Sequence, residues 1–208
     1  MAADPQAIYN WRRLDNRITT SGQPTEKQLA DIHALGVRHI VNLGLHTHEK
    51  ALPHEAASVG RLGMTYIHIS VDFQNPTADD FDQFCAVMEQ LKEVPVHVHC
   101  IANYRVSAFF YRYRRDVLGM GEARARADME QIWHPEGVWR RLSVARLTRA
   151  VKITPADTAP IMKTKQFDWH ADPITRTTPV TFTYRNTHNV QRFWCLNVVG
   201  ASNLTAAL

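Results

Sequence analysis

The 208-residue sequence has no long hydrophobic run and contains only three cysteines. A transmembrane helix needs about 20 largely apolar residues in succession, so no membrane contact is expected. The cysteines, Cys85, Cys100 and Cys195, show neither a disulfide nor a zinc spacing. The first twenty residues contain three arginines and lack the apolar segment of a secretory signal. Together these absences predict a cytoplasmic protein with free thiols.

Metal-ligand spacings are also missing. Eleven histidines are present, but no H-x-x-x-H or C-x-x-C pattern occurs. A structural metal site needs about three or four convergent ligands. We therefore predict no metal and no cofactor. His46 and His48 follow a predicted strand, so they are expected near the mouth of a pocket.

The positive charge of the chain is modest and dispersed. The formal net charge is +4, and the arginines are spread over several segments. This distribution favours a solvated surface and predicts no nucleic-acid partner, although a positive field also suits an anionic substrate. In the helical pattern of residues 106–118, we interpret the aromatic residues as a core stripe and Arg112, Arg114 and Arg115 as a solvated face.

Residues 1–150 alternate short apolar runs with helical patterns, which predicts an α/β domain with a parallel sheet. Strands are predicted over 39–44, 64–71 and 94–99. Helices are predicted from a Thr25 N-cap to Gly36, over 55–62, over 81–91 with Thr77 or Asp79 as cap, over 106–118 and 121–133, and after Pro135.

The remainder of the chain differs in character. Residues 151–165 contain two prolines without clear periodicity and are interpreted as a linker. Residues 166–208 are rich in threonine and aromatic residues, which favours β-structure. Their beginning is similar to the opening of a small uncharacterised bacterial domain. About forty residues rarely bury enough surface to fold alone, so we predict an incomplete second domain, or a segment packed on the first, of unknown function.

The segment 94–99 leads directly into Cys100, and a helix is predicted to follow shortly after. Backbone N–H groups at such a junction form a cradle for anions. The helix N-terminus and the nearby Arg105 favour the thiolate form of Cys100, which is the nucleophilic form. Ser107 is expected to hydrogen-bond the thiolate or to help it leave, and His99 to orient the loop through its ring N–H.

The pattern His99-Cys100…Arg105…Ser107 resembles the His-Cys-x5-Arg-Ser/Thr loop of protein tyrosine and dual-specificity phosphatases. The segments Ser21-Gly22-Gln23-Pro24 and Val41-Asn42-Leu43 are similar to a bacterial tyrosine-phosphatase-like family related to beta-lactamase-hydrolase-like proteins. The resemblance covers about residues 8–145. It implies a three-layer α/β/α fold with a central, mostly parallel sheet and a short C-terminal appendage.

The same resemblance implies hydrolysis of phosphomonoesters through a phosphocysteine on Cys100, without a metal. The implied partner is a phosphorylated protein or small molecule. The residues implied to line the phosphate-binding loop are His99, Ile101, Ala102, Asn103, Tyr104 and Val106.

The arginine departs from the family pattern by one position. Val106 occupies the place six residues after the cysteine, and Arg105 comes one residue earlier. One residue rotates a helical side chain by about 100°, whereas arginine binds phosphate through a planar fork. Either the loop is one residue shorter and Arg105 still points inward, or the bidentate clamp is lost. Asn103 falls on the usual glycine and tolerates a positive φ, which would keep the tight turn.

Three functions are therefore open. The first is a cysteine-dependent phosphatase, and the second is a non-catalytic pseudophosphatase that binds a phosphorylated ligand. The third is a rhodanese-like sulfurtransferase that uses a persulfide on Cys100, because the rhodanese loop is shorter. His99 and the Ser-Gly-Gln-Pro segment favour the phosphatase.

A cysteine phosphatase also needs an acid that protonates the leaving oxygen. Asp72 follows the predicted strand 64–71, at the carboxyl edge of the sheet where sites of α/β proteins form, and it precedes Cys100 by 28 residues. Asp72 is therefore the predicted acid. Asp79 and Asp80 are alternatives, but aspartates in the first turn of a helix also serve as caps.

Overall fold

A computed structural model describes residues 3–145 together with strands β6 (Thr181–Arg185) and β7 (Gln191–Cys195). These two strands pair antiparallel. The predicted linker 151–165 and the rest of the predicted segment 166–208 lie outside the described residues.

The main sheet has five strands in the order β1-β2-β5-β3-β4. Their bounds are Arg12–Arg13 for β1, Ile18–Ser21 for β2, His39–Asn42 for β3, Thr65–His68 for β4 and Val96–His99 for β5. Only β1 runs antiparallel to its neighbour, so the prediction of a mostly parallel sheet is confirmed. Strand β5, which carries the cysteine loop at its end, is central.

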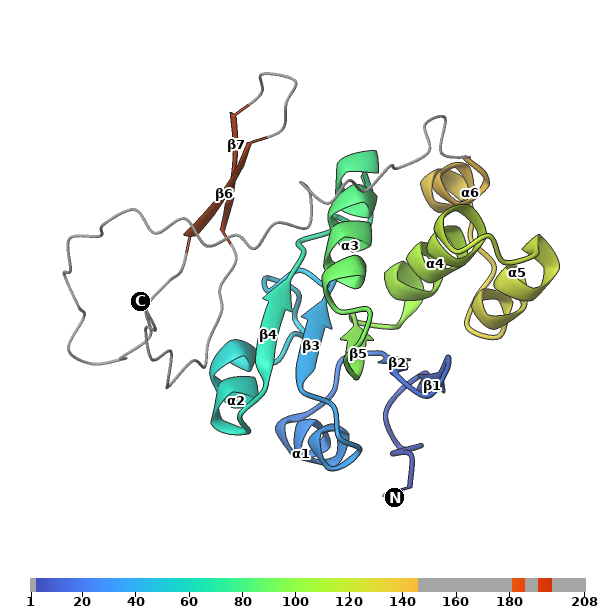
Figure 1. Cartoon of the computed structure of the whole chain (residues 1–208). Coiled ribbons are helices and arrows are strands. Elements are labelled where there is room, and N and C mark those ends of the chain that lie inside the picture. The colour runs from blue at the N-terminus through green and yellow to red at the C-terminus, as the bar shows by residue number, and fades with distance from the viewer. Residues whose placement is uncertain (1–2, 146–180, 186–190, 196–208) are drawn as a thin grey trace.

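Helices cover both faces of this sheet (Figure 1). Helices α1 (Glu26–Ala34) and α2 (Glu55–Arg61) lie on one face. The other face carries α3 (Ala78–Gln90), α4 (Tyr104–Arg112), α5 (Glu122–Glu130) and α6 (Gly137–Val144). The predicted three-layer α/β/α fold is therefore confirmed. No helix in the described part of the chain is long and apolar enough to cross a membrane.

Alternation along the strands separates two hydrophobic cores. On β3, Ile40 packs with α1 and α2, whereas its neighbour Val41 packs with the helices of the opposite face. Tyr66 and Ile67 divide in the same way on β4. Successive side chains of a strand point to opposite faces, so short apolar runs serve both layers at once.

Two predicted helix starts match the structure in detail. Thr25 caps α1 and Thr77 caps α3, each in a capping box completed by Gln28 and Asp80 respectively. Gly36, directly after the C-cap of α1, has a φ of 90°, the left-handed conformation that ends a helix. Strands β1 and β2 were not predicted, because their short polar stretch shows no apolar run.

The predicted solvated basic face of residues 106–118 is wrong. Arg112 and Arg115 are buried, and the segment continues from α4 into a π-helical turn, Tyr113–Val117. The Arg115 guanidinium donates to Asp116, to the Tyr111 hydroxyl and to backbone carbonyls near the end of α6. The Arg112 guanidinium lies 3.9 Å from the centroid of the Phe81 ring. Ion pairing and ring stacking replace water around these arginines.

Phe84, at the centre of the α3–α4 packing, is fully buried and makes edge contacts with Phe110 and Tyr113 at centroid distances of 5.1 and 5.9 Å. We expect Phe84→Ala to lower the free energy of unfolding by about 3–5 kcal/mol, because it leaves a cavity in a packed core. Urea unfolding followed by circular dichroism measures this loss. Leu118→Ala, at a 57% exposed position, is the control and should change stability by less than about 0.5 kcal/mol.

Candidate active site

The cysteine loop connects the central strand to the largest helical layer. Strand β5 ends at His99, Cys100 follows, and α4 begins at Tyr104. Cys100 is completely buried, and its backbone N–H donates to the Ser21 carbonyl at 3.4 Å. Burial at the carboxyl edge of a parallel sheet is the placement expected of a site residue in an α/β fold.

Asn103 makes the turn into α4 in the left-handed conformation, with φ 66° and ψ 4°. The prediction that asparagine tolerates a positive φ here is confirmed. Its side-chain amide donates to the Asn10 carbonyl at 2.7 Å and to the Thr20 hydroxyl at 3.0 Å. In return, the Asn10 amide donates to the Ala102 carbonyl at 3.0 Å. The turn is thus fixed both by its own residue and by the N-terminal segment.

Two glycines allow neighbouring segments to close on the loop. Gly22, after β2, forms a bridge with Ala102, and a Cβ at Gly22 would lie 2.9 Å from the Ile101 carbonyl oxygen. A Cβ at Gly44, after β3, would lie 3.0 Å from Asn42 Oδ1 and 3.5 Å from the Ile101 side chain. The segments that carried the family resemblance therefore pack directly against the cysteine loop.

The backbone N–H groups of the loop are available to a ligand. Among the described residues, no hydrogen bond satisfies the N–H groups of Ile101 or of residues 104–106. The N–H groups of residues 104–106 are orphan donors of the kind that every helix N-terminus has, and Ile101 belongs to the preceding turn. Buried donors of this kind ordinarily find a partner, and successive N–H groups around a turn bind anions.

Arg105 extends toward the carboxyl edge of the sheet. It is only 5% exposed, its Nε donates to the Val71 carbonyl at 2.9 Å, and its Cζ lies 5.0 Å from the centroid of the Phe73 ring. Among the described residues, the two Nη nitrogens have no hydrogen-bond partner. The guanidinium is thereby oriented from one side while its outer donors stay free, as a phosphate ligand requires.

Asp72 lies between the two carbonyls that anchor its loop. Arg105 binds the Val71 carbonyl before it, and the Trp139 indole N–H donates to the Phe73 carbonyl after it at 2.8 Å. One carboxylate oxygen of Asp72 accepts from the Gln74 N–H at 2.9 Å, and the residue is exposed. By contrast, Asp80 is engaged in the cap of α3, and Asp79 lies in the same first turn.

Ser107 is oriented differently from the prediction. Its hydroxyl donates to the Tyr104 carbonyl at 3.0 Å and accepts from the Trp133 indole N–H at 3.0 Å. A hydroxyl has a single proton, so in this arrangement none is directed to Cys100. Ser107 instead links the first turn of α4 to Trp133, whose ring stacks on Tyr104 at 4.7 Å.

The aromatic residues beside Arg105 form an open groove of about 530 Å³. Phe73, Trp133 and Trp139 line it, with centroid distances of 5.4 to 6.1 Å between their rings. His134 and Arg141 lie at the same groove. Since Phe73 also contacts the Arg105 guanidinium, the groove begins beside the cysteine loop.

Sequence reasoning missed Glu55, which lies 3.2 Å from the Nε2 of His99. Both side chains are buried, and Gln23 donates to the same carboxylate. The available signal was weak, because in the sequence Glu55 is only the first residue of the predicted helix 55–62. His46 and His68 stack at 3.7 Å near this carboxylate, but no group of three potential metal ligands occurs among the described residues.

The cysteine loop thus carries a buried thiol and unpaired amide donors, while the Arg105 guanidinium contacts the Val71–Phe73 segment, which also carries the Asp72 carboxylate. Such a set of groups can bind an oxyanion and attack it with a nucleophile.

Comparison with protein families gives two matches. Residues 6–145 match the model of a DSP-PTPase phosphatase fused to NAD+ kinase. Residues 167–202 match a domain of unknown function, DUF6434. Among curated proteins, none matches the chain significantly.

Solved structures show the same fold. A protein of Shewanella putrefaciens CN-32, provisionally described as a phosphatase (DUF442), is 33% identical with a TM-score of 0.60, over 66% of this chain and 91% of the other. A provisionally described phosphatase of Neisseria meningitidis is 25% identical with a TM-score of 0.50, over 62% and 94%. The core catalytic domain of the PP-IP phosphatase SIW14 of S. cerevisiae is 13% identical with a TM-score of 0.58, over 73% and 94%.

Burial of His68 beside the site predicts a pH-dependent stability. Desolvation lowers the pKa of His68 to about 4, against 6.5 for an ordinary histidine. Between these values the unfolded chain binds a proton that the folded protein excludes, so stability falls as the pH falls from 6.5 to about 4. His68→Gln keeps a donor for the Gly44 carbonyl, which His68 Nε2 contacts at 2.7 Å.

As the pH falls over this range, the free energy of unfolding of the wild type, measured in urea, should decrease by up to about 3 kcal/mol more than that of His68→Gln. His134→Gln, at an exposed position, should follow the wild type. Parallel pH curves for all three proteins would contradict the prediction.

Proposed function

Because the chain belongs to the DSP-PTPase family of phosphatases fused to NAD+ kinase, we propose that it is a phosphomonoester hydrolase that uses Cys100 as nucleophile. The observation that supports this most is the set of unsatisfied N–H groups of Ile101 and residues 104–106, which lie next to the buried thiol in sequence. A dianionic phosphoryl group is the ligand that such a cradle fits best.

In the proposed reaction, the Cys100 thiolate attacks phosphorus and the bond from phosphorus to the leaving oxygen breaks. The loop amides and the free Nη donors of Arg105 bind the non-bridging oxygens, where charge is concentrated. Water then hydrolyses the phosphocysteine, which releases phosphate and restores the thiolate. His99 and the loop residues Ala102, Tyr104 and Val106 contribute position and backbone.

The Arg105 geometry favours the first of the two alternatives for the shifted arginine. Its Nε is held by the Val71 carbonyl, and its side chain is buried at the carboxyl edge rather than turned to solvent. We therefore propose that the loop is one residue shorter and that Arg105 takes the place of the family arginine. A pseudophosphatase and a sulfurtransferase remain the competing outcomes of the tests below.

Asp72 is the proposed proton donor to the leaving oxygen, and afterwards the base for the attacking water. It is exposed, and it lies between the two anchored carbonyls of the Val71–Phe73 segment, one of which binds Arg105. The adjacent aromatic groove would hold the apolar part of a leaving group.

Cys100→Ser should abolish hydrolysis of a generic aryl phosphate, with a loss of about 10³-fold or more, because the covalent intermediate cannot form. Arg105→Lys should lower kcat/KM by about 100-fold, since an ammonium cannot replace a two-pronged donor. Arg61→Lys, at an exposed ion pair on α2, is the matched control and should leave activity unchanged. Colorimetric release of the aryl alcohol measures all four proteins.

Two results would contradict the proposed phosphatase activity and indicate another function. Binding of inorganic phosphate to Cys100→Ser without any turnover by the wild type indicates a pseudophosphatase. Production of thiocyanate from thiosulfate and cyanide, dependent on Cys100, indicates a sulfurtransferase.

Asp72→Asn should lower kcat about 10²-fold for a substrate with a poor leaving group, such as an alkyl or unsubstituted phenyl phosphate. The loss should shrink for a nitrophenyl ester, because nitrophenolate leaves without protonation. Asp80→Asn alters the cap of α3. It should change the free energy of unfolding but should not lower kcat more for the poor leaving group than for the nitrophenyl ester. An equal decrease of kcat for both esters would show that Asp72 is not the general acid.

A further inference from the structure

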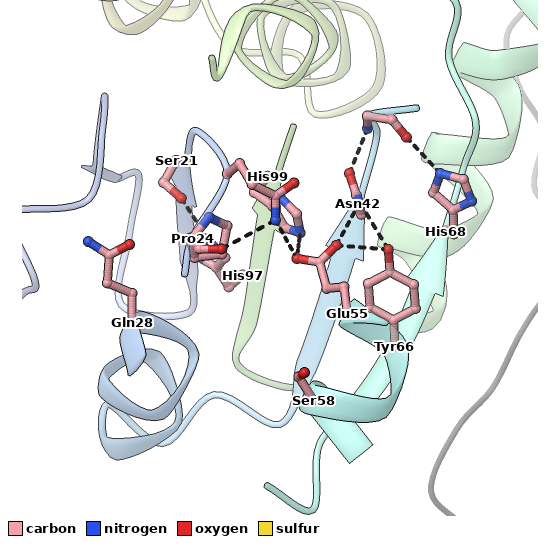
Figure 2. Close-up of polar contacts among 12 residues, drawn as sticks. Ser21, Pro24, Gln28, Asn42, Glu55, Ser58, Tyr66, His68, His97 and His99 are labelled. Carbon is pink, nitrogen blue, oxygen red and sulfur yellow. Dashed lines mark hydrogen bonds and ion pairs between the residues drawn. The ribbon is translucent and has the colours of Figure 1, made fainter. Parts of the chain in front are cut away.

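Glu55 is a buried carboxylate that the proposed reaction does not use. It begins α2 and is 3% exposed. Its Oε1 accepts from Gln23 Nε2 at 2.6 Å and lies 3.2 Å from His99 Nε2. Its Oε2 accepts from Asn42 Nδ2 at 2.9 Å and from the Tyr66 hydroxyl at 3.0 Å. Figure 2 shows the carboxylate between His99 on one side and Asn42 and Tyr66 on the other.

These partners keep the carboxylate charged. Burial alone raises the pKa of Glu55, but the electrostatic interaction with His99 and the hydrogen bonds from Gln23 and Tyr66 outweigh it, so the pKa is lower than usual. A buried charge with so many donors is an anchor for the groups around it, because moving any of them leaves the charge poorly solvated.

The partners of Glu55 flank the cysteine loop on both sides. His99 directly precedes Cys100, and its carbonyl accepts from the Leu43 N–H at 2.8 Å. The Gln23 side chain binds Glu55, while its backbone N–H donates to the Ile101 carbonyl at 3.1 Å. One carboxylate thus contacts the residue before Cys100 and, through Gln23, the residue after it.

The other half of the network extends toward the surface. Tyr66 gives its single proton to Glu55, so the exposed His46, whose Nε2 lies 2.8 Å from the Tyr66 hydroxyl, acts as donor. The Asn42 Oδ1 accepts from the Gly44 N–H at 2.6 Å. Glu55 therefore joins β4 to the ends of β3 and β5 and to the segment that follows β2.

We propose that Glu55 is a positioning residue, whose carboxylate holds His99 and Gln23 and thereby keeps the backbone of residues 100–102 in the geometry that binds the phosphoryl group. This inference rests on the proposed function for its catalytic consequence. The positioning of the loop itself is measurable without any turnover, through the reactivity of the Cys100 thiol.

Glu55→Gln is the main test, because it keeps the shape and removes the charge. The pH midpoint of Cys100 alkylation by iodoacetamide should rise by about one unit, and kcat should fall about tenfold with a smaller change in KM. Removing a nearby negative charge would by itself lower the midpoint. A rise therefore identifies loop displacement rather than a direct charge effect.

Glu26→Gln is the matched control. Glu26 also lies in the first turn of a helix and accepts from Arg61 and Ser58 of α2, but it is exposed and outside the network. It should leave the alkylation midpoint unchanged. Gln23→Met is the second variant, for use if Glu55→Gln does not fold. It keeps the carboxylate, removes one link to the loop, and should raise the midpoint by a smaller amount.

An unchanged or lowered midpoint in Glu55→Gln, or in Gln23→Met where Glu55→Gln does not fold, would overturn the positioning role. If the midpoint rises as expected while the wild type hydrolyses no phosphoester, the positioning role stands and the proposed phosphatase activity fails. If the wild type is active and the variant matches it in both measurements, the activity stands and the positioning role fails.

Discussion

The burial of one carboxylate constrains the whole carboxyl edge of the sheet. Transfer of a charged group from water to the protein interior costs several kcal/mol of free energy unless hydrogen-bond donors replace its hydration. Glu55 accepts hydrogen bonds from Gln23, Asn42 and Tyr66 and contacts His99, which lie in or shortly after four parallel strands, so those strands must keep their register for the charge to be accommodated. The same edge carries Cys100. The stability of the sheet and the geometry of the cysteine loop therefore depend on one set of hydrogen bonds.

This dependence explains why the sequence predicted the layers better than the site. Capping boxes and hydrophobic periodicity are local signals, and they identified α1, α3 and the strands β3, β4 and β5. Strands β1 and β2 are short and polar. They exist because β5 and the N-terminal segment provide partners, which is a tertiary effect that a local pattern does not contain.

In the site, too, the features that depend on single residues were predicted, and those that depend on tertiary packing were not. Asn103 was predicted to take a positive φ because that preference belongs to the residue itself, and the structure has it. The contacts of Ser107 with Tyr104 and Trp133, and the burial of Arg112 and Arg115, depend on the packing of α3, α5 and α6 against α4 and the π-helical turn. Glu55 was missed for the same reason, since a glutamate in the first turn of a helix is ordinarily exposed and favoured by the helix dipole.

The arginine spacing follows from how the loop enters its helix. Because Asn103 turns in the left-handed conformation, α4 begins at Tyr104, and Arg105 is its second residue. A side chain in the first turn of a helix extends toward the N-terminus, which here is the direction of the loop and of the Val71 carbonyl. Val106 instead turns into the core. The first turn of α4 thus directs the Arg105 guanidinium to the edge of the sheet and the Val106 side chain into the core.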